Sequence, residues 1–207
     1  MLILSFILVA LGRTVPKLSP EVSTLLFETG IDNIATIVEE LSIRAKAIYL
    51  PSSFTSGQSQ ALIPLHNDLS PSSITHVLPQ RFIVRYGANP EDIGLLVNTT
   101  GTTVVNMLKS RSALTLSEFE LALTSLFKGI LGVADGAKVT YNENHHIGVE
   151  IHNPNIENKT TWSYHCLGGP LASAVASVAA EVWDKPVTIA QEEHKNGNCT
   201  IELELLE

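Results

Sequence analysis

The chain has 207 residues, of which 44% are hydrophobic and 16% are charged, and its formal net charge is −8. A chain of this length and apolar content can bury one core or two closely packed subdomains, which excludes a disordered protein. The negative charge and the lack of a basic patch argue against a nucleic-acid partner, because a phosphate backbone is bound by clustered Lys and Arg.

An apolar run covers residues 2–11 and is followed at once by Arg13 and Lys17. The run is too short to span a bilayer, which takes about 20 helical residues, but basic residues beside an apolar segment are typical of the cytoplasmic side of a membrane segment. Residues 1–18 are therefore predicted to be the end of a membrane segment, its upstream half missing from this chain, plus a linker. A buried N-terminal element is the alternative, which would leave a cytoplasmic protein.

Residues 19–112 alternate short apolar runs with polar loops, which predicts a small α/β part. Ser19 and Pro20 are typical of a helix start, because Ser caps free N–H groups and Pro fits the first helical position. Helices are expected over residues 19–30, 32–41 and 102–109, strands over 47–50, 61–65 and 81–86, and a strand or buried turn over 93–97. Pro64 favours a sheet edge for 61–65, because Pro cannot donate to a strand ladder.

The pattern of apolar and polar residues over 113–207 predicts a helix followed by a ββαββ unit. The helix is expected over 117–130 with Ser117 as N-cap, and the strands, which alternate with a period of two, are expected over 138–142, 147–152, 187–191 and 199–205. In the third of these strands, Val187, Ile189 and Gln191 are predicted to share one face. Asn196-Gly197 predicts a tight hairpin turn, because both residues tolerate the positive φ that the turn requires.

The helix of this unit is expected over 171–183, with Pro170 at its first position. Ala172, Ala176 and Ala180 lie on one line along it, so that the helix can approach a sheet closely. The sequence therefore predicts an α+β fold in which helices pack on one face of an antiparallel sheet.

The C-terminal third resembles the 4-vinyl reductase-like domain. The matching residues are Cys166, Gly168, Pro186-Val187, Glu192-Glu193, Gly197, Cys199 and Leu203. The resemblance implies a module that binds small molecules or hydrocarbons rather than an enzyme. The family usually has a further Cys where this chain has His194, so a metal site does not carry over with the resemblance. The whole chain also resembles uncharacterised archaeal proteins with an N-terminal membrane segment.

A ligand pocket is expected between the helix 171–183, the sheet and the helix 117–130, since ligand pockets are concave and mostly apolar. Its predicted lining residues are Tyr141, Tyr164, His165 and Trp183. The functional hypothesis is a non-enzymatic module that binds or senses a small apolar molecule. An interaction domain that forms a homodimer without ligand is the alternative, and a metal- or thiol-dependent sensor is a third.

The third hypothesis uses Cys166, His194 and Cys199 as metal ligands, with His165 as a fourth. Zinc favours four Cys or His donors, although this spacing matches no compact zinc motif. The two Cys could also form a disulfide or stay as buried thiols. Glu192-Glu193 is interpreted as a solvated turn.

No catalytic residues are predicted, because the chain has no G-x-S-x-G, P-loop or dinucleotide motif. The helix start at Gly168-Gly169-Pro170 could hold an anion through free N–H groups, but Gly at a helix entry more often serves backbone geometry.

Overall fold

The computed structural model describes residues 30, 33–66, 74, 76–108, 115–141, 146–156 and 162–206. The chain divides into two compact units, Met1–Ile37 and Val38–Glu207. The predicted membrane segment at residues 2–11 lies outside the described residues, and so does the predicted helix over 19–30 apart from Gly30. Residues 33–40 are helical, in agreement with the helix expected over 32–41.

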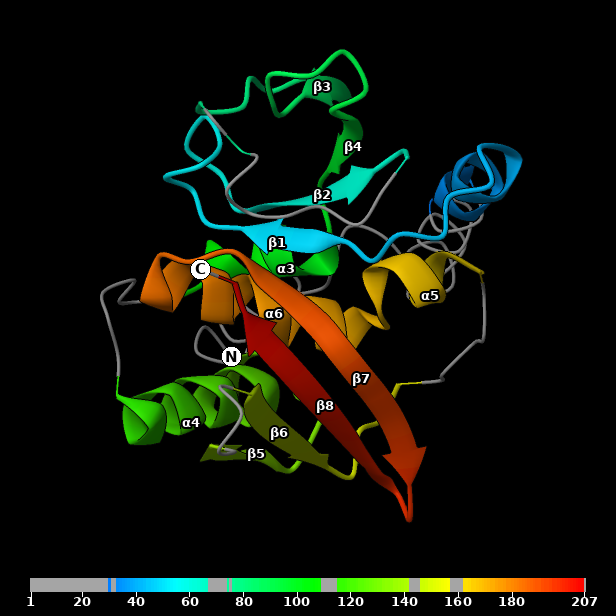
Figure 1. The fold of residues 1–207 in the computed structure, drawn as a ribbon. Coiled ribbons are helices and arrows are strands. Elements are labelled where there is room, and N and C mark those ends of the chain that lie inside the picture. The colour runs from blue at the N-terminus through cyan, green and yellow to red at the C-terminus, as the bar shows by residue number, and fades with distance from the viewer. Residues whose placement is uncertain are drawn as a thin grey trace, which may run out of the picture. The chain divides into compact units, whose positions relative to one another are not determined.

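One antiparallel sheet organises the second unit, and in its described residues eight strands follow the order β3-β4-β2-β1-β7-β8-β6-β5 (Figure 1). The strands are β1 (Ile48–Leu50), β2 (Gln60–Pro64), β3 (Ile83–Arg85), β4 (Ile93–Val97), β5 (Gly136–Tyr141), β6 (His146–His152), β7 (Val187–Lys195) and β8 (Asn198–Leu205). Neighbouring strands run antiparallel throughout. Together with the helices packed on the sheet, this confirms the predicted α+β class.

The helices are α3 (Thr100–Val105), α4 (Leu116–Thr124) with a π-helical continuation η2 (Ser125–Ile130), α5 (Trp162–Leu167) and α6 (Pro170–Trp183). Helix α6 is central: every residue from Leu171 to Val182 is buried, and the helix packs on α3, β1 and β7. Pro170 is at its N-terminal position as predicted. Gly101 lets α3 approach α6 closely, because a Cβ at residue 101 would lie 2.0 Å from the Ser177 Oγ.

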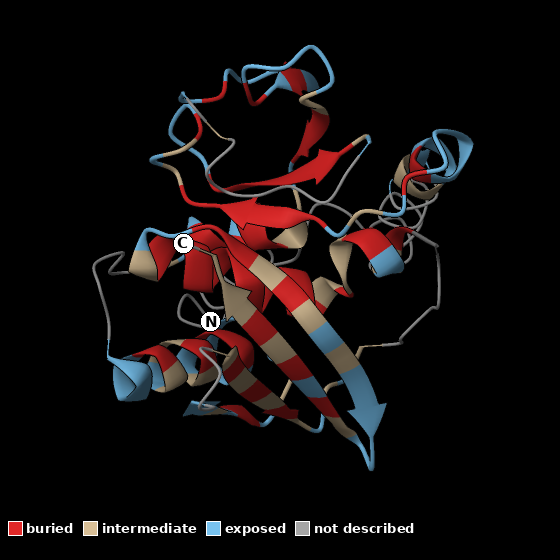
Figure 2. Cartoon of the chain, in the orientation of Figure 1, coloured by how far each residue is buried: buried red, intermediate tan, exposed pale blue. Residues whose placement is uncertain are grey.

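The strands of the sheet are buried to different degrees (Figure 2). All residues of β1 and β2 are buried, whereas β6 alternates between buried Ile147, Val149 and Ile151 and partly exposed neighbours. One face of the β1–β2 region packs on α6, and side chains of its other face join Leu78 and Tyr86 in a second apolar cluster. A strand that is buried on both faces is apolar along its whole length, whereas a strand that is buried on one face alternates between apolar and polar residues.

Strand β2 lies inside the sheet, between β1 and β4, so the prediction of an edge strand from Pro64 is wrong. Pro64 is the last residue of β2, and the ladder continues with the Leu65 N–H, which donates to the Ile93 carbonyl at 3.0 Å. A Pro at a strand end leaves the rest of the ladder intact, and this is why an interior strand tolerates it.

Several helices also begin or end at residues other than those predicted from the sequence. Helix α4 is capped by Thr115 and not by Ser117: Thr115 and Glu118 form a reciprocal capping box, in which the Glu118 N–H donates to the Thr115 Oγ1 at 3.3 Å. Helix α3 begins at Thr100 instead of residue 102 and ends at Val105. Helix α5 covers the segment around Tyr164-His165-Cys166, for which no helix was predicted.

The two parts predicted on either side of residue 112 share this sheet. Strand β1 pairs with β7, with Ile48 opposite Thr188 and Tyr49 opposite Val187. The predicted ββαββ order is present as β5, β6, α6, β7 and β8, with α5 added before α6. Residues 38–207 belong to one compact unit, and the boundary near residue 112 stays a prediction.

Candidate functional site

A cavity of about 250 Å³ is lined by residues of α5, of β7 and of the segment just before β1. Helix α5 contributes Tyr164, His165 and Cys166, and the segment before β1 contributes Lys46 and Ala47. Strand β7 contributes the run from Ile189 to Glu192 together with His194. The Lys46 Nζ donates to the Ala190 carbonyl at 2.5 Å, which ties the segment before β1 to β7 beside the cavity.

A β-bulge in β7 decides which side chains face this region. The register against β8 shifts between Ile189 and Gln191, so that Ala190 is the extra residue. Beyond it, Glu192 lies opposite Ile201 and His194 lies opposite Cys199. Because directly opposed residues share a face of a sheet, Glu192 and His194 lie on the face of the buried Ile201 and Cys199.

The bulge corrects two predictions. Gln191 is exposed and does not share the face of Val187 and Ile189, because the extra residue reverses the alternation. Glu192 is part of β7 and not of a solvated turn, and only 16% of its side chain is exposed.

Glu192 meets the start of α6. Its Oε2 accepts a hydrogen bond of 2.7 Å from the Gly169 N–H, where the free N–H groups and the dipole of a helix N-terminus favour a negative charge. A Cβ at Gly169 would lie 2.6 Å from the Glu192 Oε1, and Gly168 has a φ of +68°. The negative charge at this helix start is therefore the protein's own carboxylate.

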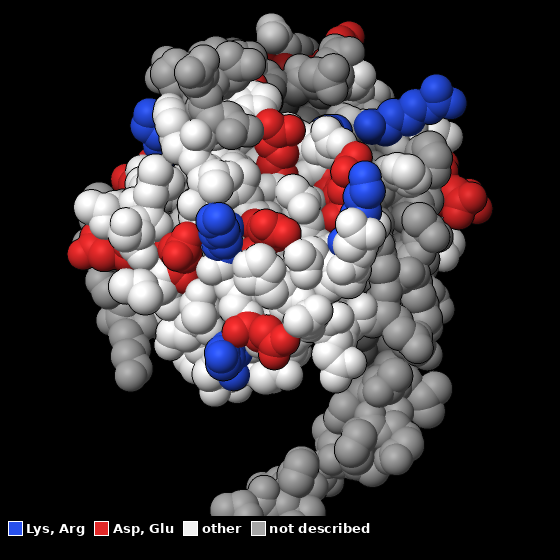
Figure 3. Space-filling model, turned by 90° about the horizontal axis from the view of Figure 1, so that it is seen from below, with Lys and Arg blue, Asp and Glu red and all other residues white. Residues whose placement is uncertain are grey.

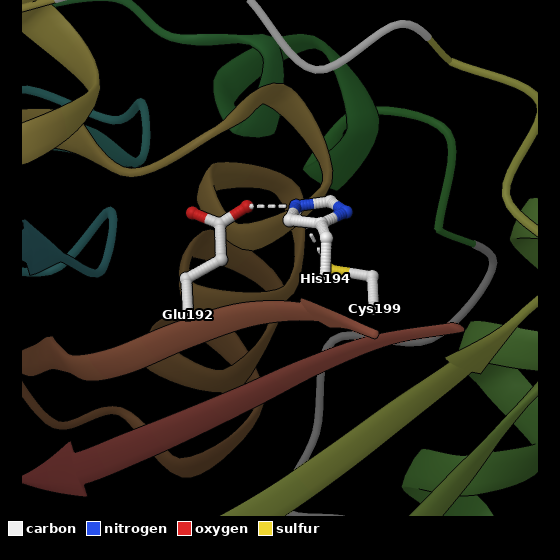
Figure 4. Close-up of side chains that lie close together, drawn as sticks. All are labelled: Glu192, His194 and Cys199. Carbon is white, nitrogen blue, oxygen red and sulfur yellow. Dashed lines mark hydrogen bonds and ion pairs between the residues drawn. The ribbon is translucent and has the colours of Figure 1, made fainter. Parts of the chain in front are cut away.

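Glu192, His194 and Cys199 converge on the face of the hairpin that they share (Figure 4). The His194 Nε2 lies 3.0 Å from the Glu192 Oε1 and 3.6 Å from the Cys199 Sγ. One ligating atom from each of the three residues lies within 4.8 Å of the other two. Carboxylate, imidazole and thiolate are all common metal ligands.

The electrostatics of Cys199 oppose a role as nucleophile. Burial, and secondly the negative charge of Glu192, raise the pKa of its thiol to about 12. The thiolate is the reactive form of Cys, so the thiol is inert at neutral pH. In a catalytic triad the base uses one ring nitrogen for the nucleophile and the other for the acid, whereas Cys199 and Glu192 meet the same nitrogen of His194.

The structure separates the four predicted ligand-binding residues. Tyr164 and His165 line the cavity. Tyr141 is 52% exposed at the end of β5, and the Trp183 ring packs against Phe119 with ring centroids 4.6 Å apart. This aromatic contact lies between α4 and α6, where the pocket was expected.

The structure also separates the predicted metal ligands. His194 and Cys199 lie together, whereas Cys166 does not belong to their group, and its Sγ lies 3.6 Å from the Ile43 carbonyl oxygen. Cys166 and Cys199 are both free, buried thiols rather than a disulfide.

Sequence reasoning missed Glu192 as a member of this group, although two signals could have found it. A two-residue turn at Asn196-Gly197 places His194 opposite Cys199, and residues two apart on a strand share a face, which adds Glu192. Both expectations hold in the structure.

The described residues contain one run, Ser163–Trp183, that is long and apolar enough to cross a membrane by length and composition. In the most apolar window of this run, 83% of the residues are buried inside the fold. The helix of a protein core has the same properties, so this run is weak evidence for a membrane span.

The charged side chains on the face shown in Figure 3 are mixed in sign: Lys and Arg stand near Asp and Glu, with uncharged residues between them. Charges of mixed sign largely offset one another beyond about 10 Å in physiological salt. The predicted lack of a nucleic-acid partner stays a prediction.

Comparison with known proteins gives a family and no activity. No curated protein and no solved structure matches the chain. Residues 9–204 match a family described as a domain of unknown function, DUF7982. Because this match covers most of the chain, the protein belongs to the DUF7982 family.

Proposed function

We propose that this protein is a non-enzymatic module that binds or senses a small molecule in the cavity between α5 and β7. The observation that carries the proposal is the cavity of about 250 Å³, whose wall includes Tyr164 and His165. The resemblance of the C-terminal third to the 4-vinyl reductase-like domain supports the same class of function.

The size and the mixed lining of the cavity favour a small ligand that has both apolar and polar groups. Pockets for drug-sized ligands measure about 300–1,000 Å³, so a cavity of about 250 Å³ suits a smaller molecule. Ala47, Ile189 and the Tyr164 ring supply apolar wall, and His165 and His194 supply polar atoms.

In the metal-free chain, the raised pKa of Cys199 keeps its thiol protonated at neutral pH and makes it a poor nucleophile, which supports binding over catalysis. The apolar run over residues 2–11, with Arg13 and Lys17 behind it, supports association of the module with the cytoplasmic side of a membrane.

Native mass spectrometry of the full chain tests the binding function. Extra mass that leaves on denaturation is expected for the wild-type chain and for Ala88→Phe, which adds the same ring at an exposed loop residue. Ala190→Phe places a ring at the wall of the cavity and is expected to lose the extra mass. A clean apo mass for all three proteins would contradict the proposal.

The edge strand β3 favours a second candidate function, dimerisation without a ligand. Phe82 and Ile83 are 49% and 61% exposed at this end of the sheet, where unpaired backbone groups can pair with another strand. The same mass spectra report the oligomeric state. A dimer that Ile83→Lys converts to monomer, together with a clean apo mass, would support this alternative.

A further inference from the structure

The three side chains on the β7–β8 hairpin have the spacing of a metal site. With Zn–S of about 2.3 Å and Zn–N or Zn–O of about 2.0–2.1 Å, a tetrahedral ion holds sulfur and nitrogen about 3.5 Å apart and nitrogen and oxygen about 3.3 Å apart. The observed separations are 3.6 Å from Cys199 Sγ to His194 Nε2 and 3.0 Å from His194 Nε2 to Glu192 Oε1. Two of the three separations are thus close to those of a tetrahedral site, and all three donor atoms lie within 4.8 Å of one another.

Either tautomer of His194 leaves one of the two contacts of its Nε2 weak. If the His194 Nε2 carries a proton, it can donate to Glu192, but the Cys199 thiol then has no acceptor on that nitrogen. If the Nε2 is unprotonated, it can accept from Cys199, but its lone pair then faces the Glu192 oxygen. A cation at their centre makes all three groups electron-pair donors and removes the conflict.

The surroundings hold two of the donors in place. The Gly169 N–H fixes the Glu192 carboxylate through Oε2, which leaves Oε1 directed at His194. Cys199 is fully buried on β8, in the strand pairs that place it opposite His194 and Ile151. Metal ligands are commonly oriented by such outer hydrogen bonds.

We propose that Glu192 Oε1, His194 Nε2 and Cys199 Sγ bind a divalent transition metal, with zinc as the first candidate. Three protein ligands leave the fourth position to water or to a bound molecule, as in open zinc sites. Glu192 and His194 also line the cavity, so the metal would offer its fourth position to the small molecule. This last step rests on the proposed binding function, whereas the metal site itself does not.

The test uses the full chain, with its zinc content measured as purified and, after removal of metal, with Co²⁺ alone as the probe. One equivalent of zinc is expected, and Co²⁺ is expected to give a thiolate-to-cobalt charge-transfer absorption. Cys166→Ser, which removes the cysteine outside the group, should keep this absorption, and Cys199→Ser should abolish it. Glu192→Gln keeps an acceptor for the Gly169 N–H and should weaken Co²⁺ binding at least tenfold.

A wild-type chain that gives no thiolate absorption with Co²⁺ would overturn the metal site, as would an absorption that persists in Cys199→Ser. If Cys199→Ser does not fold, Glu192→Gln and His194→Asn decide the question through the Co²⁺ affinity. A chain that binds the metal but carries no small molecule refutes the proposed function and leaves the metal site standing. A chain that binds a small molecule but no metal refutes this inference and leaves the proposed function standing.

Discussion

Gly169 determines how closely Glu192 can approach the start of α6. Its backbone angles are a φ of −68° and a ψ of 170°, which other residues adopt without strain. Glycine leaves room for the carboxylate, because the Glu192 Oε1 would lie 2.6 Å from an added Cβ. A larger residue here would therefore conflict with the carboxylate and not with the backbone.

We expect Gly169→Ala to displace the Glu192 side chain and break its hydrogen bond to the residue 169 N–H. Hydrogen bonds to charged groups contribute about 1.5–3 kcal/mol, and the partial exposure of Glu192 reduces this to about 1–2 kcal/mol in the free energy of unfolding. Urea denaturation measures the change. Gly129→Ala is the control, because an added Cβ there meets only the Ser125 Oγ at 3.9 Å. Equal losses for both variants would contradict the explanation.

Tyr49 links stability to alkaline pH. Burial raises the pKa of its hydroxyl well above the usual value, and the hydroxyl donates to the Leu167 carbonyl. Above the unfolded pKa of about 10, the unfolded chain has lost the proton that the folded chain keeps. The unfolded state then binds fewer protons, so the free energy of unfolding falls as pH rises, by up to about 1.4 kcal/mol per pH unit.

We expect the stability advantage of the wild-type chain over Tyr49→Phe to shrink between about pH 9 and 11, since Phe has no proton to lose. Near neutral pH the variant should be less stable by about 1 kcal/mol, from the lost hydrogen bond. Urea denaturation of both proteins across this range provides the comparison, and parallel curves would disagree with the expectation.

At the scale of elements, the start of α4 shows how a cap is chosen. Thr115 and Ser117 are both good N-cap residues by type, but only Thr115 lies three residues before Glu118. The Glu118 Oε2 accepts from the Thr115 N–H at 2.8 Å, and these hydrogen bonds hold the pKa of the Glu118 carboxyl below its usual value. This contribution to stability is present above the unfolded pKa of Glu and is lost as pH falls through the folded pKa.

We expect Thr115→Ala to lower the free energy of unfolding by about 1 kcal/mol, and Ser117→Ala to change it little. Thermal unfolding at pH 7 compares the two variants directly. A larger loss of stability for Ser117→Ala than for Thr115→Ala would show that Ser117 is the N-cap, as the sequence predicts.

The bulge in β7 is the second feature at this scale. If Ala190 were an ordinary strand residue instead of a bulge, strict alternation from Ile189 would turn Gln191 inward and Glu192 and His194 outward. One backbone irregularity therefore brings two charged or titratable side chains beside the buried Cys199. Bulges are common next to functional sites, where they redirect side chains.

At the scale of the whole molecule, the pairing of β1 with β7 joins the N-terminal and C-terminal parts into one sheet. Helix α6 depends on the same union, because α3 packs against it where Gly101 meets Ser177. The C-terminal ββαββ unit alone would expose one edge of β7 and one side of α6.

We therefore expect residues 38–207 to unfold cooperatively and residues 113–207 alone to lack a cooperative transition. Circular dichroism during thermal unfolding of the two fragments makes the test. A sharp transition for residues 113–207, close to that of the longer fragment, would show that the boundary predicted near residue 112 separates independent domains.

Local patterns were sufficient to predict the α+β class and the C-terminal strands. Period-two alternation predicted the buried Ile147, Val149 and Ile151, and Pro170 marked the start of α6. Asn196 and Gly197 have φ angles of 54° and 78°, as the predicted hairpin turn requires. These features depend on residues within a few positions of one another, so a single sequence contains them.

Which side chains meet depends on contacts between distant parts of the chain. Three features depend on strands and helices that are distant in sequence. They are the bulge at Ala190, the helix formed by Tyr164-His165-Cys166, and the interior position of the strand that ends at Pro64. The cavity and the Glu192–His194–Cys199 group follow from these placements. The pairing of strands that are distant in sequence determines which side chains are buried and which residues lie opposite one another. The local periodicity of the sequence does not show either of these.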